Sequence, residues 1–222
     1  MALANGVRFI WLDKYIGRDG EYQEFKRRFE NTLEETAAVP PVPQDPINAL
    51  ILALELNGAP FLFAHEATQA VTLIKDHHDK QIIFITSGSL GQHIIPNILA
   101  SYPYVYRFYI FCNYIENYTE LGIEYSSCLQ MFTHETDLLV RLTRDISKDI
   151  IKQGEIYMHI YDVENAQKCF EHAVTLNVKA NQICVPEDIS WDSLRKLNGH
   201  GNSIGLIQQT RDMQNQEQQR QQ

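Results

Sequence analysis

The sequence predicts an α/β fold of the flavodoxin-like class, a three-layer sandwich built around a mainly parallel five-stranded sheet. Two observations lead to this prediction. Short runs rich in isoleucine, phenylalanine and tyrosine recur up to about residue 133, and the segments between several of them repeat apolar residues every three to four positions. Strands that alternate with helices need right-handed crossovers, so the sheet is expected to be largely parallel with helices on both faces.

Each predicted strand is a short apolar run that stops at polar, glycine or proline residues. The strands are predicted over residues 7–12, 60–64, 81–86, 106–112 and 128–133. Apolar stripes at helical spacing, such as Phe25, Phe29 and Leu33, predict the covering helices. These helices are predicted over residues 21–35, 67–79, about 90–101 and 137–152.

The chain is expected to have three parts. Residues 1–153 form the α/β domain, and residues 154–207 form a helical extension that begins with one amphipathic helix over 155–176. Residues 208–222 are rich in glutamine and have almost nothing to bury, which predicts disorder or a frayed polar helix. The prolines of residues 39–46 predict a stiff loop, because proline lacks an N–H donor. The connection over residues 113–127 has no clear pattern.

Composition excludes several classes of function. The formal net charge is −9 and the pI is about 5.3, which disfavours a general nucleic-acid binder that must neutralise phosphates. The four cysteines have neither disulfide nor zinc spacing, so reduced thiols and a cytoplasmic location are expected, with no metal site. No apolar run is long enough to span a membrane. A soluble protein is therefore expected.

The most informative segment runs from Gln81 to Pro96, where a buried strand enters a glycine-containing turn and then an apolar helical pattern. With strand order 2-1-3-4-5, the first and third strands flank the point where the sheet changes direction, so the loops that follow them meet at its carboxyl edge. The N–H groups at a helix start attract anions. The residues expected to bind a ligand there are Asp13, Ser87, Gly88, Ser89, Gly91, Gln92 and His93.

The same loop matches no complete catalytic motif. It is neither a Walker A loop nor a dinucleotide-binding glycine pattern nor a serine nucleophile elbow, and no lysine is placed to meet a phosphate. Its glycines also have a structural explanation, since they permit a tight turn and close helix packing. Ser89 also has a structural explanation, because a serine at this position can cap the start of the helix. We therefore assign no catalytic residue, and the sequence identifies no cofactor.

Three runs of the sequence resemble a known family. The strand at residues 9–13, followed by a strand ending at Ser87 and a strand ending at Cys112, resembles response-regulator receiver domains over about residues 7–152. The run Ser87-Gly-Ser-Leu-Gly-Gln-His-Ile-Ile-Pro96, followed by Tyr109-Ile-Phe-Cys112, looks like an uncharacterised receiver-like domain of invertebrate multidomain proteins, over about residues 7–150. In those proteins the domain often precedes tetratricopeptide repeats or an arginine ADP-ribosyltransferase region, which implies a regulatory or adaptor role. No transferase motif is visible in this chain.

The residues at the strand ends depart from receiver chemistry. Receivers have acids after the first strand, a phosphate-accepting aspartate after the third, serine or threonine after the fourth and lysine after the fifth. Here Asp13 fits, but Thr86 and Ser87 stand in the acceptor region, Cys112 and Asn113 at the end of the fourth strand and residues 133–135 at the end of the fifth. The resemblance therefore implies a degenerate receiver, without a Mg²⁺ site or aspartyl phosphorylation.

Two functions remain open on this basis. The first is a non-enzymatic interaction or regulatory module that binds a protein partner, with a homodimer through the free sheet edge as one form. The second is a nucleotide- or anion-binding enzyme that uses the loop of residues 87–91 for nicotinamide or phosphate chemistry. A fold alone does not decide between them.

Overall fold

The computed structural model describes residues 7–15 and 61–220 of the 222-residue chain. Two compact units are present. Among the described residues, the sheet unit comprises residues 7–15 and 61–138, and the helical unit comprises residues 139–220. The helix predicted over residues 21–35 and the proline-rich loop at 39–46 lie outside the described residues.

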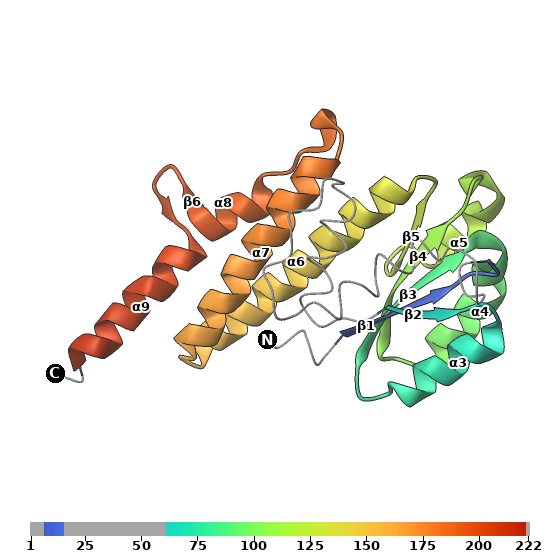
Figure 1. Cartoon of the computed structure of the whole chain (residues 1–222), viewed down its shortest axis with the longest axis horizontal. Helices are drawn as coiled ribbons and strands as arrows, with labels where there is room; N and C mark the ends of the chain where they lie inside the picture. Colours follow the sequence, from blue (N-terminus) through green and yellow to red (C-terminus); the bar gives the residue numbers. More distant parts are fainter. Residues whose placement is uncertain (1–6, 16–60, 221–222) are drawn as a thin grey trace, which may run out of the picture. The chain divides into compact units, whose positions relative to one another are not determined.

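The sheet unit contains a five-stranded parallel sheet in the order β2-β1-β3-β4-β5 (Figure 1). Its strands are β1 (Val7–Leu12), β2 (Phe61–Ala64), β3 (Gln81–Ser87), β4 (Val105–Phe111) and β5 (Leu129–Phe132). This is the flavodoxin-like α/β arrangement, so the predicted fold class and strand order are confirmed. The predicted strand limits agree with the observed ones within about one residue, because each strand coincides with a run of residues that pack well on a pleated surface.

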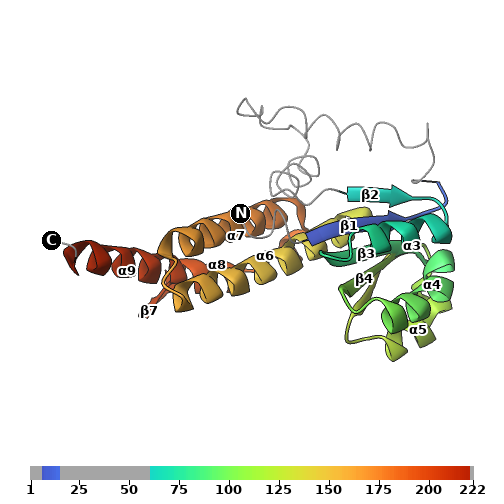
Figure 2. The ribbon, with the colours of Figure 1, turned by 90° about the horizontal axis from the view of Figure 1, so that it is seen from below.

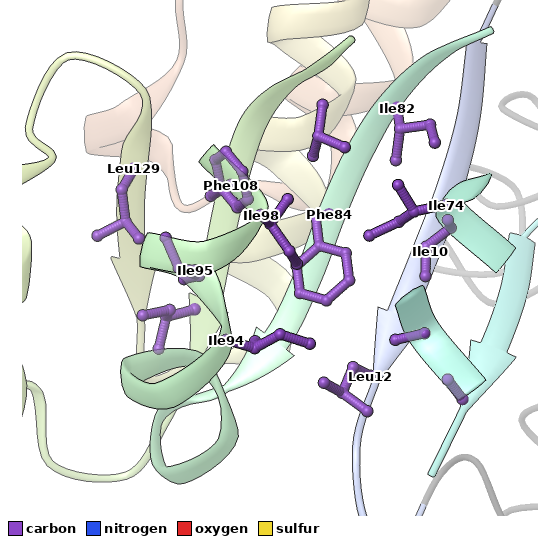
Figure 3. Packing of buried hydrophobic residues seen from close by; sticks show 14 residues of the cluster. Ile10, Leu12, Ile74, Ile82, Phe84, Ile94, Ile95, Ile98, Phe108 and Leu129 are labelled. Carbon is purple, nitrogen blue, oxygen red and sulfur yellow. The ribbon is translucent and has the colours of Figure 1, made fainter. Parts of the chain in front are cut away.

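One face of the sheet is covered by α3 (Ala67–Asp76) and α4 (Gly88–Ser101), which lie on the same side of the strands (Figure 2). Figure 3 shows Phe84 at the centre of this core, with Ile98 of α4 and Ile74 of α3 beside it. All three side chains are fully buried. Burial of side chains of this size stabilises the fold by about 1.5–3 kcal/mol each.

The opposite face of the sheet is rich in aromatic side chains. The rings of Phe9 and Phe61 stack with their centroids 4.5 Å apart, and the ring of Trp11 lies 6.5 Å from that of Phe63. Phe9 and Tyr109 are completely buried. Both faces of the central strands are therefore shielded from water, as expected for a parallel sheet in a three-layer fold.

The poorly defined connection at residues 113–127 contains two short helices. They are η1 (Ile115–Tyr118) and α5 (Thr119–Glu124). Leu121 of α5 packs against the core cluster on the face that α3 and α4 cover. The sequence did not predict these helices because one turn of helix is too short to show an apolar period.

The helical unit is built from longer helices. In chain order the elements are α6 (Glu135–His159, which begins in the sheet unit), α7 (Val163–Ile183), η2 (Pro186–Asp188), α8 (Asp192–Asn198), β6 (Gly199–His200), β7 (Ser203–Ile204) and α9 (Leu206–Arg220). The glutamine-rich segment is helical as far as Arg220, and Thr210 within it is fully buried. Along the chain, the division between the two units falls between Leu138 and Leu139, within α6.

The single helix predicted over residues 155–176 is wrong. The chain leaves α6 at His159 and starts α7 at Val163, and Tyr161 between them has a φ of 60°. Asp162 then caps α7, since its side chain accepts a hydrogen bond from Asn165 N at 3.2 Å. The apolar period continues across this turn, and for this reason the periodicity alone did not reveal it.

Close packing joins α6 to α7. Gly154 of α6 faces the fully buried ring of Phe170, and a Cβ atom at residue 154 would stand only 2.5 Å from Phe170 Cε1. Nearby, the buried amide of Asn177 donates to Ser147 Oγ and to the carbonyl of Ala173. A small residue at 154 therefore sets the distance between the two helices.

Gly154→Ala is expected to lower the free energy of unfolding of the helical unit by about 1–3 kcal/mol, because the new methyl group overpacks a closed contact. The matched control is Gly122→Ala in α5, whose Cβ would meet the end of the flexible Met131 side chain at 3.0 Å. Both changes gain the same helix propensity, about 0.5–1 kcal/mol. Denaturant titrations of the two variants measure the difference, and equal stabilisation by both changes would contradict this packing.

His172 is expected to make stability depend on pH. The pKa of His172 is lowered from 6.5 to about 4, mainly by burial, and the charge of Lys179 acts in the same direction. The unfolded chain therefore binds a proton between these values that the folded chain does not, so the stabilisation is complete above pH 6.5 and is lost as the pH falls toward 4. The loss is about 2–3 kcal/mol. Denaturation midpoints of His172→Leu should lack this dependence, whereas His200→Leu, at an exposed position, should retain it.

Candidate functional site

The candidate site lies at the carboxyl edge of the sheet, where the strand order changes direction. Leu12 of β1 pairs with Thr86 of β3, so the residues that follow these strands emerge side by side. Ser87 in turn pairs with Phe111 of β4. Beyond these strand ends lies a pocket of about 490 Å³, within the size range of small-molecule and peptide sites.

Four of the seven predicted ligand residues line this pocket. They are Asp13, Ser87, Gly88 and Ser89. The other three do not line it, because α4 carries them away from the strand ends. Gly91 is buried, where a Cβ would stand 2.8 Å from Thr86 Cγ2, and the exposed side chains of Gln92 and His93 contact each other at 3.2 Å.

Most of the remaining lining residues carry no sequence pattern that marks them as members of a site. The sequence places Cys112 and Asn113 at the end of a strand, but it gives the aromatic residues of the lining no role in a site. The lining residues beyond the predicted set are Trp11, Tyr15, Phe111, Cys112, Asn113, Tyr114, Asn117, Tyr118 and Leu138. Their position in the chain could have identified them. Residues that directly follow the fourth strand of such a sheet must lie beside the loop that follows the third strand.

The amino end of α4 forms one wall of the pocket. Ser87 is the N-cap residue, and its side chain makes no capping hydrogen bond. The ring of Tyr118 lies against Gly88 so closely that a Cβ atom there would collide with it. Glycine is therefore required at residue 88 for the contact, and the ring and the helix start together shape this wall.

Asp13 lies at the opposite side of the switch point, directly after β1. Its backbone N–H donates to the carbonyl of Ala64 at 2.9 Å, which ties the end of β1 to β2. Its carboxylate accepts a hydrogen bond from the backbone N–H of Tyr15 at 2.8 Å. This local turn holds the carboxylate at the pocket.

The thiol of Cys112 is kept protonated at neutral pH. Burial raises its pKa, and the carboxylate of Glu116 raises it further, while a backbone hydrogen bond at Tyr114 acts in the opposite direction. The thiolate is the reactive form of cysteine, so a thiol with a raised pKa is a poor nucleophile. The hydroxyl of Thr86 is also withdrawn, because the residue is fully buried and donates to the carbonyl of Ser87 at 3.3 Å.

The described ranges, 7–15 and 61–220, contain neither a metal-binding cluster nor a membrane-spanning helix. No group of three or more histidine, cysteine, aspartate or glutamate side chains there is arranged to hold a metal ion. In the same part of the chain, no helix combines the length and apolar character needed to cross a bilayer.

Comparisons with known proteins add no family to this description. The chain matches no protein-family model, no curated protein and no solved structure. The site must therefore be interpreted from its own geometry.

The raised pKa of Cys112 predicts slow alkylation. In a variant that keeps Cys112 and replaces Cys128, Cys169 and Cys184, iodoacetamide should modify the folded protein more slowly at pH 7.5 than it modifies the urea-unfolded chain. The rate should rise only as the pH passes the ordinary thiol range of about 8.5. Mass spectrometry over time measures it, and rapid modification of the folded protein at pH 7 would contradict a protonated thiol.

Proposed function

We propose that this chain is a non-enzymatic, receiver-like interaction module whose carboxyl-edge pocket receives part of a protein partner. The observation that carries the proposal is the chemistry of the lining. Among the described residues, five aromatic side chains line the pocket, namely Trp11, Tyr15, Phe111, Tyr114 and Tyr118. Aromatic side chains supply large contact area at low entropy cost and are enriched at protein interfaces.

The polar groups of the pocket support binding more than catalysis. Asp13 is the only formally charged side chain among the described lining residues. The Cys112 thiol has a raised pKa, and the Thr86 hydroxyl at the end of β3 is buried. Nucleophilic catalysis needs an activated group with a base in hydrogen-bond reach, and none of the hydrogen bonds described for these residues forms such a pair.

A nucleotide- or anion-binding enzyme is the second candidate. The observation that favours it is the start of α4, a helix of 14 residues whose N-cap Ser87 lacks a side-chain cap. Such a helix start attracts phosphate. Against it, no lysine or arginine stands among the described residues of the lining, and the carboxylate of Asp13 repels an anion at the same pocket.

The interaction module is tested with a photo-crosslinking residue. Benzoylphenylalanine at Tyr114, on the pocket rim, is expected to crosslink the full chain to a discrete partner in an extract of its source cells. The control is the same residue at Ile123, outside the lining. The two positions match in exposure, at 68% for Tyr114 and 72% for Ile123, so a surface-driven reaction would label both alike.

A thermal-shift panel completes the test. Adenine and nicotinamide nucleotides, inorganic phosphate and Mg²⁺ are expected to leave the melting temperature unchanged, because a ligand that binds only the folded state would raise it. Saturable stabilisation by a nucleotide, together with no specific crosslink at Tyr114, would overturn the interaction module and support the enzyme.

A further inference from the structure

We infer that the carboxyl-edge pocket binds a proline-rich segment of the partner in the extended polyproline II conformation. This inference rests on the interaction function proposed above and names the chemistry of the partner. Three properties of the described residues lead to it: the balance of charges around the pocket, the supply of hydrogen-bond donors in the lining, and the exposed aromatic ring beside these donors.

The charges around the pocket favour a neutral segment. Asp13 is the one formally charged residue in the described lining, and its carboxylate already accepts a hydrogen bond from Tyr15 N at 2.8 Å. Lys14, the next residue, is exposed and holds its Nζ 6.0 Å from the centroid of the Tyr15 ring. Outside the lining, the exposed carboxylate of Glu116 acts on the thiol of Cys112. Exposed charges of both signs therefore surround the pocket, and because solvent and salt screen them, a charged segment gains little there.

Hydrogen-bond donors are present after β4 and at the start of α4. Asn113 and Asn117 are exposed lining residues, and no hydrogen bond within the described part of the chain engages either side-chain amide. The N–H groups of Gly88 and Ser89, in the first turn of α4, have no acceptor within the helix. The thiol of Cys112 keeps its proton because its pKa is raised. This part of the lining therefore suits a segment that offers carbonyl oxygens.

A proline-rich segment has this chemistry. Each proline has a backbone carbonyl and no N–H group. The polyproline II conformation makes no internal hydrogen bonds, so its carbonyls remain available to donors on a binding partner. The proline ring carries no charge, and it fixes the backbone before binding, which lowers the entropy lost when the segment is ordered.

Aromatic surface for the proline rings lies beside the donors. Tyr114 lines the pocket and is 68% exposed, so its ring is open to a ligand. The ring of Tyr118 lines the same side and is held against Gly88. Grooves lined by aromatic side chains are the surfaces on which proline-rich segments dock. A pocket of about 490 Å³ receives a short stretch of such a segment.

The test measures the fluorescence anisotropy of a fluorescein-labelled octaproline peptide during titration with the full-length protein. The control is a labelled peptide of the same length in which glycine and serine alternate, because it is neutral but lacks the rings and the fixed backbone. The octaproline peptide should bind saturably and about tenfold or more tightly than the control. Its binding should not weaken as salt is added, since it forms no ion pair. Equal binding of the two peptides, or saturation by neither, would overturn the inference.

Substitutions at Tyr114 locate the aromatic contact. Tyr114→Ala should weaken the octaproline peptide about tenfold, because tyrosine is enriched among the residues that dominate binding energy. Tyr114→Phe keeps the ring and should weaken the peptide about twofold or less. The matched control is Tyr161→Ala, at a 76% exposed tyrosine outside the lining, which should leave binding unchanged. Equal loss in the two alanine variants, or no loss in a folded Tyr114→Ala protein, would contradict binding at this pocket.

A substitution at Asn117 tests the donors. Asn117→Asp replaces the amide by a carboxylate of the same shape, which accepts hydrogen bonds but donates none. It should weaken the octaproline peptide about fivefold, since one hydrogen bond is lost. Asn198→Asp, at an exposed asparagine outside the lining, is the matched control and should leave binding unchanged. Equal binding by the two variants would contradict the inference, which requires donors in the lining.

The crosslink at residue 114 separates the two proposals, because benzoylphenylalanine keeps an aromatic ring at this position. If octaproline competes with the crosslink and the crosslinked segment of the partner is rich in proline, the inference stands. If the crosslink forms but octaproline does not reduce it, the interaction function stands and the proline-rich segment is wrong. If neither a specific crosslink nor octaproline binding is observed, both proposals fail.

Discussion

The parallel pairing of β1 with β3 is the constraint on which the candidate site depends. Leu12 and Thr86 are far apart in the sequence, and their pairing brings Asp13 and the start of α4 to one edge of the sheet. Because β2 lies on the other side of β1, the strand order changes direction between β1 and β3, which is where ligand sites form in open parallel sheets. Without this register, no pocket would combine a carboxylate with a helix start.

The same aromatic side chains serve both the sheet and the pocket. Trp11 is 3% exposed and lies 6.5 Å from the ring of Phe63, yet it also lines the pocket. Tyr118 likewise packs on Gly88 and shapes the wall at the start of α4. Walls held by packing are already in place before a ligand arrives, and such preorganisation lowers the cost of ordering the site on binding.

Close packing between helices also organises the helical unit, through other residues. Gly154 lets the Phe170 ring reach α6, and Arg144 donates to Asn181 Oδ1 and to the carbonyl of Asp188, which ties the loop after α7 to both helices. The turn at Tyr161 permits this pairing, because it reverses the chain between two long helices. A continuous apolar period across the turn predicts one helix, since periodicity records which residues are buried and not where the backbone reverses.

The sequence alone determined the fold class, the strand positions and the strand order of this protein, because buried strands must consist of contiguous apolar residues and alternating helices restrict the topology. It also placed Asp13 and the residues Ser87 to Ser89 at the sheet edge where the pocket lies. Only the tertiary structure decided that Gly91 supports packing, that Gln92 and His93 lie outside the pocket, and that the residues after β4 complete it. The physical reason is that a pocket is defined by side chains from separate segments, whose distances depend on register and packing rather than on local pattern.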